Sequence, residues 1–174
     1  TKNGMRCSAA TAHLKPALKR SNVTILTNAL TMQIIHNNGK AIGVEYKHSG
    51  DLKKVYANNS VIVSCGAIKS PQLLMLSGIG PAKHLNSMGI KTSVDLKGVG
   101  ENLQDHLLVA TGFECTKNVT IHKITQPHQK LYAGLKWLIT RKGIVASNIW
   151  EMGGQVFSNH KVKYPNLQYH FCLL

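Results

Sequence analysis

The chain has 174 residues, of which 43% are hydrophobic, so it is long enough to bury a core and has the composition of a globular protein. Its 21 Lys and Arg against 7 Asp and Glu give a net charge of +14, which raises nucleic acid, anionic membranes and acidic proteins as partners. The cations are scattered, however, and no RNA-binding or zinc-finger pattern accompanies them, so we expect no nucleic-acid binding. The four cysteines and nine histidines show no metal-ligand spacing, and no apolar run has the length of a membrane span.

The amino-terminal residues predict a short helix. Ser8 or Thr11 is the expected N-cap, and an apolar pattern continues through Leu14 toward Pro16.

Residues 23–57 predict a β-meander. Asn37-Asn38-Gly39 and Ser49-Gly50 are the expected turns, since Asn and Gly tolerate positive φ. The extended segments that these turns connect are predicted at 23–27, 32–36, 41–46 and 52–56.

The central stretch, residues 60–80, reads as a strand, a turn, a helix and a stop. Val61–Val63 is β-branched and apolar, which suits a strand that is buried on both faces, and Gly66 permits a tight turn after it. Ser70 is the expected N-cap of the helix, with Pro71 at its first position. Strand–Gly–helix units place backbone N–H groups and a positive helix end at the carboxyl edge of a sheet, where nucleotide cofactors commonly bind. The stretch therefore predicts α/β architecture.

Further elements follow in order, with a helix at 81–88 and a strand at 90–94. The loop at 98–106 contains Gly-Val-Gly, but Leu103 stands where a dinucleotide loop has its third glycine. Asp105 and His106 in this loop are expected to make structural hydrogen bonds, the alternative being an acid–base pair.

The last third predicts one helix among extended segments. The helix spans 131–140, with an apolar face and an end at Gly143. Extended segments are expected at 109–115, 146–156 and 166–171, and they suit an antiparallel sheet.

Beginning at Gly66, the string Gly-Ala-x-x-Ser-Pro-x-Leu-Leu-x-x-Ser-Gly-Ile-Gly resembles a signature of the glucose–methanol–choline (GMC) family of FAD-dependent alcohol oxidoreductases. The string Gly-Val-Gly-Glu-Asn-Leu-Gln-Asp-His, at 98–106, is also typical of that family. The resemblance implies part of a Rossmann-like FAD-binding domain, residues 1–107, joined to the start of an antiparallel-sheet substrate domain, residues 108–174. It further implies that Cys65, Gly66 and Ala67 lie against FAD, and that the backbone of Thr31, where the family usually has Val, contacts the adenine.

Three later strings are most similar to the choline-oxidising branch of this family: Leu-Lys-Trp-Leu, Trp-Glu-Met-Gly-Gly and Pro-Asn-Leu-Gln-Tyr-His-Phe. Cys7 departs from that branch, which usually carries Trp there. By this resemblance Glu151 occupies the position that binds the substrate ammonium group. Trp150 is its candidate aromatic partner, but neighbouring strand residues face opposite ways unless a bulge intervenes.

The same resemblance implies hydride transfer from an alcohol, such as choline, to the flavin, a histidine base, and an electron acceptor. The chain starts at Thr1 and ends in an apolar run, so we expect an internal piece of a longer protein, with the catalytic histidine beyond Leu174. Such a piece alone is expected to bind no flavin and to dissolve poorly. A mitochondrial location is expected from the resemblance alone.

Other functions stay open at this point. One is a different alcohol dehydrogenase of the same family. The others are a basic binding module and a flavin-free relative that is kept for interaction. A flavin spectrum of the full-length product separates the enzyme from the last two, and retention on heparin at raised salt tests the basic module.

Overall fold

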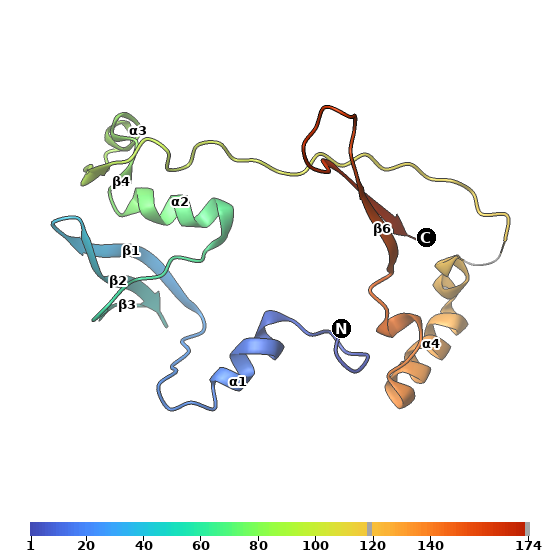
Figure 1. Cartoon of the computed structure of the whole chain (residues 1–174). Helices are drawn as coiled ribbons and strands as arrows, with labels where there is room; N and C mark the ends of the chain where they lie inside the picture. Colours follow the sequence, from blue (N-terminus) through green and yellow to red (C-terminus); the bar gives the residue numbers. More distant parts are fainter. Residues whose placement is uncertain (118–119, 173–174) are drawn as a thin grey trace. The chain divides into compact units, whose positions relative to one another are not determined.

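The computed structural model describes residues 1–117 and 120–172, with the side chains of Lys123 and Glu151 left out (Figure 1). The chain forms two compact units, one of Ile25–Val109 and one that combines Thr1–Thr24 with Ala110–Leu174. Both units mix helices and strands, as the sequence predicts. In the described part of the chain no helix combines the length and apolarity that crossing a membrane requires.

The unit Ile25–Val109 begins with a three-stranded antiparallel meander in the order β1-β2-β3. The strands are β1 (Ala29–Asn37), β2 (Lys40–His48) and β3 (Asp51–Tyr56). Asn38 and Gly39 connect β1 to β2 at φ values of 48° and 77°, as a tight hairpin turn requires. The meander and both of its turns are confirmed, whereas the predicted strand at 23–27 is wrong. Asn28 has a φ of 55°, which interrupts the extended backbone, and the first strand begins after it.

The central helix α2 (Gly66–Leu76) begins earlier than the sequence predicts. Ser70 is not its N-cap. The Ser70 hydroxyl instead accepts a hydrogen bond from the N–H of Cys65, 3.0 Å away, and so closes the first turn of the helix. Pro71 consequently lies inside α2, where its missing N–H removes one helical hydrogen bond.

The segment before α2 is not a strand. Residues 61–64 pair with no strand among the described residues, and Ile62 is 84% exposed. A strand buried on both faces needs a strand on either side of it, because its backbone groups would otherwise lack partners.

After α2 the chain forms a small parallel unit. Strand β4 (Ile79–Gly80) pairs with β5 (Val94–Asp95), and α3 (Ala82–Ser87) lies between them in sequence. The predicted helix at 81–88 is confirmed, and the predicted strand lies a few residues later, at β5. Asp95 also fixes the start of α3, since its Oδ1 accepts a hydrogen bond of 2.9 Å from the N–H of Ala82.

The core of this unit is small and joins the meander to the parallel unit. Leu85 of α3 is its most buried side chain, with 1% exposed. Ile34 of β1, Leu73 of α2 and Val99 are the other buried apolar residues, and Ser77 is buried among them. The core therefore depends on residues from β1, α2 and α3 together.

In the second unit the first helical segment is short. It consists of a π-helical turn, η1 (Ala10–Leu14), and α1 (Lys15–Ala17). The N-cap of η1 is Ala9, which makes no side-chain cap bond, so neither Ser8 nor Thr11 is the N-cap. Ser8 still supports the first turn, since the N–H of Thr11 donates to its hydroxyl over 3.4 Å.

The remainder of the second unit contains one longer helix and one hairpin. Helix α4 (Pro127–Thr140) follows the 3-10 turn η2 (Ile121–Thr125) and precedes the turn η3 (Ile144–Ala146). Strands β6 (Trp150–Val156) and β7 (Leu167–Cys172) pair antiparallel. The helix and both strands are confirmed in kind. The predicted extended segment at 109–115 forms no strand. Phe113 within it is 93% exposed, and Leu107 just before it is 95% exposed.

The amino-terminal loop packs on the end of α4. The indole Nε1–H of Trp137 donates a 2.6 Å hydrogen bond to the carbonyl oxygen of Gly4. The guanidinium of Arg141 lies 4.3 Å from the centre of the same indole ring. Gly4 has a φ of +67°, and a Cβ added there would collide with the carbonyl oxygen of Arg141. Only glycine fits this contact.

Gly4→Ala is therefore expected to lower the free energy of unfolding by about 2–4 kcal/mol, through backbone strain and the collision with Arg141. Gly50→Ala is the matched control, because Gly50 has a φ of +93° and nothing within 4 Å of an added Cβ. Gly50→Ala introduces only the backbone strain of a positive φ, and it should lower the free energy of unfolding by about 1–2 kcal/mol. Urea unfolding of the two variants makes the comparison. Equal losses would mean that the contact with Arg141 contributes nothing.

Candidate functional site

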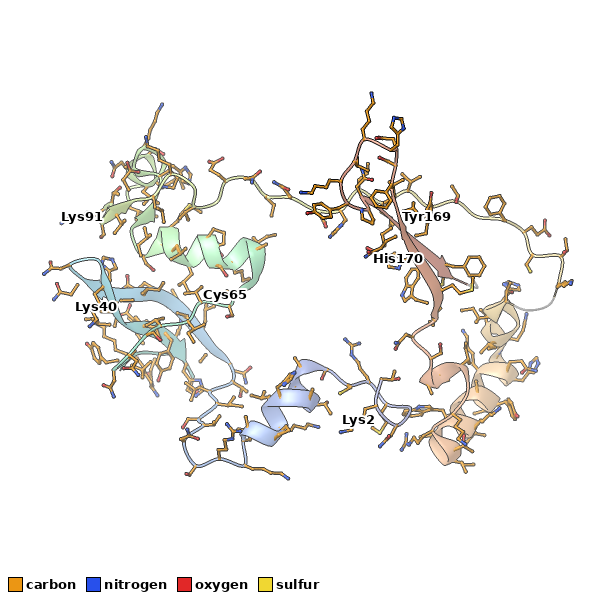
Figure 2. All side chains as sticks on the ribbon, viewed as in Figure 1. Lys2, Lys40, Cys65, Lys91, Tyr169 and His170 are labelled. Carbon is orange, nitrogen blue, oxygen red and sulfur yellow. The ribbon has the colours of Figure 1, made fainter. Side chains whose placement is uncertain are left out.

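The start of α2 carries the three residues predicted to lie against the cofactor. Cys65, labelled in Figure 2, is the N-cap. Gly66 opens the helix with a φ of +84°, and Ala67 follows. All three are exposed, and a Cβ added to Gly66 meets no atom within 4 Å. The first turn of a helix also presents backbone N–H groups that have no intrahelical partner. This end of α2 is thus an open surface of hydrogen-bond donors.

Thr31 lies on the element next to α2. It is half-buried in β1, where it pairs with Tyr46 of β2, and the pairing shifts between Thr31 and Gln33. Because α2 packs against β1, the structure brings the predicted Thr31 contact and the Cys65–Ala67 contact onto neighbouring elements of one unit. Their assignment to FAD stays a prediction.

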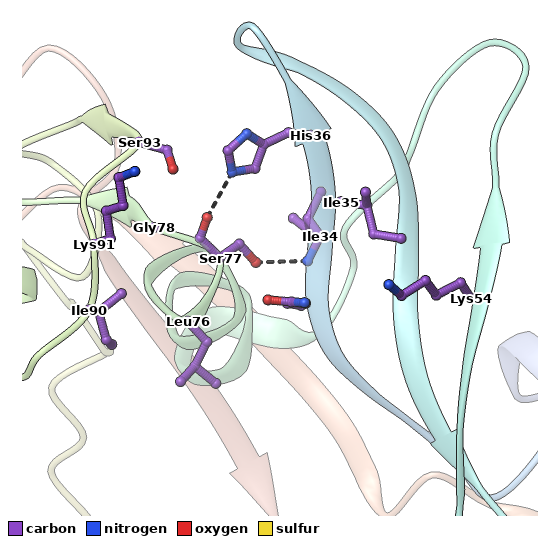
Figure 3. Close-up of a pocket in the computed structure, with 11 residues that line it drawn as sticks. Ile34, Ile35, His36, Lys54, Leu76, Ser77, Gly78, Ile90, Lys91 and Ser93 are labelled. Carbon is purple, nitrogen blue, oxygen red and sulfur yellow. Dashed lines mark hydrogen bonds between the residues drawn. The ribbon is translucent and has the colours of Figure 1, made fainter.

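A pocket of about 380 Å³ opens where the carboxyl-terminal end of α2 meets β1 (Figure 3). Polar groups from both elements and from residues 90–93 line it, including His36, Ser77 and Lys91. Figure 3 shows two hydrogen bonds in it, one from the N–H of Ile34 to the Ser77 hydroxyl and one between His36 and the Ser77 carbonyl oxygen. The sequence predicts no role for His36 or Ser77. The one signal for Ser77 is its fixed place in the string that ends Ser-Gly-Ile-Gly.

The candidate substrate residues belong to the other unit. Trp150 begins β6, is 61% exposed, and makes an edge-to-face contact with His170 of β7, with 5.3 Å between the ring centres. Figure 2 labels His170 beside Tyr169 on this hairpin. Glu151 is also part of β6, but its side chain lies outside the described part of the chain.

The hairpin has an irregularity at Glu151. Trp150 pairs with Cys172 and Met152 with Phe171, so β6 advances by two residues while β7 advances by one. This is a β-bulge with Glu151 as the extra residue. The regular alternation that would set Trp150 and Glu151 on opposite faces is therefore interrupted between them.

Asp105 and His106 do not form a side-chain pair. The Asp105 carboxylate accepts a 2.7 Å hydrogen bond from the backbone N–H of His106, and both residues are exposed. The predicted structural use of Asp105 is confirmed. Among the described residues, no three His, Cys, Asp or Glu side chains come together as metal ligands.

The family described as GMC oxidoreductase matches residues 1–108 of this chain. The oxygen-dependent choline dehydrogenase of Staphylococcus aureus (strain JH9) is 46% identical over 168 residues, which cover 97% of this chain and 29% of the relative. This chain thus spans less than a third of the length of that protein.

Two solved structures are similar in fold. An FAD-dependent oxidoreductase from Chaetomium thermophilum superposes with a TM-score of 0.74 at 29% identity, over 83% of this chain and 26% of that one. Formate oxidase from Aspergillus oryzae, in an R554K variant, gives a TM-score of 0.71 at 30% identity, over 87% of this chain and 26% of that one. The predicted architecture, part of an α/β FAD-binding fold, agrees with these neighbours.

Proposed function

Because this chain belongs to the GMC oxidoreductase family, we propose that it is part of an FAD-dependent enzyme that oxidises the CH–OH group of choline or a closely related alcohol. The observation that carries the proposal is the 46% identity to a choline dehydrogenase over 97% of the chain. FAD is the cofactor that the family and its FAD-dependent structural neighbours support. The proposed enzyme also needs an electron acceptor.

The start of α2 fits the cofactor in one respect that the structure shows. The positive φ of Gly66 and the open space beside it leave the backbone accessible to a ligand. We assign Cys65, Gly66 and Ala67 to the adenosine part of FAD, with the backbone of Thr31 on the adenine. When bound, FAD supplies the acceptor for the hydride that leaves the alcohol carbon. The role of these residues is to bind and orient it.

The beginning of β6 is the proposed contact for the substrate cation. A quaternary ammonium group has no N–H donors, so a protein holds it by an opposite charge and by aromatic faces. Glu151 supplies the charge in this proposal, and Trp150 supplies the aromatic face. The bulge between Trp150 and Met152 supports the pairing, because it removes the geometric objection that a regular strand would raise.

The experiment that tests the function uses the full-length protein that contains this chain. We expect it to purify with the visible absorption of an oxidised flavin, and to lose that absorption anaerobically when choline is added. A matched addition of trimethylamine, which has no hydroxyl group to oxidise, should leave the spectrum unchanged. A protein without flavin, or with a flavin that choline does not reduce, would refute the proposal.

A further inference from the structure

Three hydrogen bonds that involve a side chain meet at Ser77, the residue that follows α2. Its hydroxyl donates to the carbonyl oxygen of Leu73 over 2.6 Å and accepts from the N–H of Ile34 over 2.8 Å. Its own carbonyl oxygen lies 3.0 Å from His36 Nε2. A carbonyl oxygen can only accept, so Nε2 carries the proton in this contact. We call these three bonds the Ser77 latch, and Figure 3 draws the two that reach β1.

The latch joins two elements that are distant in sequence. Its bonds to Leu73 and Ile34 are buried, and its bond to His36 is part-buried beside the pocket. Ser77 is 7% exposed and Ile34 is 6% exposed, so losing one partner leaves a buried polar group without its hydrogen bond. The two bonds to β1 span 43 and 41 residues of sequence. Because they meet β1 at two separate positions, Ile34 and His36, they fix the angle between β1 and α2 as well as their distance.

The pairing of β1 with β2 does not by itself determine the angle between β1 and α2. β1 is an edge strand of the meander, and its register shifts once between Thr31 and Gln33 and again between Ile35 and His36. Only residues 33–35 pair regularly between these two shifts. The contact of Ile34 with Ser77 falls inside that short regular stretch, so Ser77 contacts β1 between its two irregularities.

We propose that Ser77 and His36 are positioning residues. They hold Thr31 of β1 and the start of α2, at Cys65–Ala67, in the relative position that the adenosine part of FAD requires. Thr31 lies on β1 three residues before Ile34, about 10 Å away along a strand, and Gly66 lies at the other end of α2, about 16 Å from Ser77 along the helix axis. A change in the angle between β1 and α2 therefore moves Thr31 relative to Gly66. This inference rests on the proposed FAD function and adds two residues that do not themselves touch the cofactor.

The expected effect follows from the population of the competent arrangement. When only a fraction of the molecules holds β1 and α2 at the binding angle, the apparent dissociation constant rises by the inverse of that fraction. Apolar contacts of Ile34 and Leu73 remain without the latch, so the fold persists while the angle varies. We expect the latch variants to raise the apparent dissociation constant of FAD about tenfold.

The test titrates FAD into the apo form of the full-length protein and follows flavin fluorescence. Ser77→Ala and His36→Leu should each weaken binding about tenfold, whereas His36→Gln, whose amide N–H can replace Nε2, should bind within about twofold of the parent. Val99→Ala is the control for stability, because Val99 is a buried core residue outside the latch. It should lower the melting temperature without weakening FAD binding.

Two results would overturn the inference. One is unchanged FAD binding in His36→Leu; the other is a Val99→Ala protein that loses as much FAD affinity as the latch variants. If Ser77→Ala does not fold, the comparison of His36→Leu with His36→Gln decides alone, and equal binding by these two overturns the inference. A parent protein that binds no FAD would refute the proposed function itself, which is a different outcome from a parent that binds FAD and variants that match it.

Discussion

Glu151→Gln in the full-length protein is expected to lower kcat/KM for choline by about a hundredfold, while the value for 3,3-dimethylbutanol changes by no more than about threefold. The two substrates have the same shape, but only choline carries a charge. Removing the carboxylate leaves the ammonium group without its counter-charge, and the neutral substrate never used it. Steady-state kinetics with both alcohols make the measurement.

Glu114→Gln is the matched control for this variant. It removes the same charge from an exposed glutamate in the same unit. We expect both substrates to react as in the parent, since exposed charges at a distance are screened by salt. Equal losses for choline and 3,3-dimethylbutanol in Glu151→Gln would show that Glu151 stabilises the structure and does not recognise charge.

Gly66→Val should abolish most flavin binding. Gly66 has a φ of +84°, which a β-branched residue adopts only with strain of about 1–3 kcal/mol, and the new side chain would fill the open space beside the helix start. We expect flavin occupancy of the purified protein below about one tenth of the parent value, a change that corresponds to more than 1.4 kcal/mol of binding free energy. The ratio of flavin absorbance to protein absorbance gives the occupancy.

Gly39→Val separates loss of the site from loss of the fold. Gly39 also has a positive φ, +77°, and also has nothing within 4 Å of an added Cβ, but it lies in the turn between β1 and β2. The strain is similar and the location is different. A Gly39→Val protein that keeps its flavin beside a Gly66→Val protein that loses it supports the assignment, and parent-level flavin in Gly66→Val contradicts it.

The sequence predicts correctly those elements that neighbouring residues determine by themselves. Asn38-Gly39 and Ser49-Gly50 fix the two turns of the meander through their own φ preferences, and no distant residue is needed. Local signals alone also explain why the predicted start of α2 is wrong. Ser70 and Pro71 carry the usual start signals of a helix, but Ser70 uses its hydroxyl on the N–H of Cys65 and the helix begins at Gly66.

Features that depend on residues far away in the chain could not be predicted from the sequence. A strand at Val61–Val63 requires neighbouring strands, and none of the described residues provides one. The Ser77 latch needs Ile34 and His36, and nothing near these two residues in sequence marks them as partners of a serine more than 40 positions away. The bulge at Glu151 depends on the register of β7, which alternation in β6 alone does not reveal. The proposed boundary between residues 107 and 108 stays a prediction.

The bond from Trp137 to Gly4 has a consequence for the order in which the chain folds. The two residues are 133 positions apart, and the loop at Gly4 packs on the end of α4. During synthesis at about 5–20 residues per second, residues 1–24 leave the ribosome on the order of ten seconds before α4 does. The unit Ile25–Val109 contains its own core and is complete before then. Residues 1–24 are therefore made before the unit Ile25–Val109, but they reach their contact with α4 only after that unit is complete.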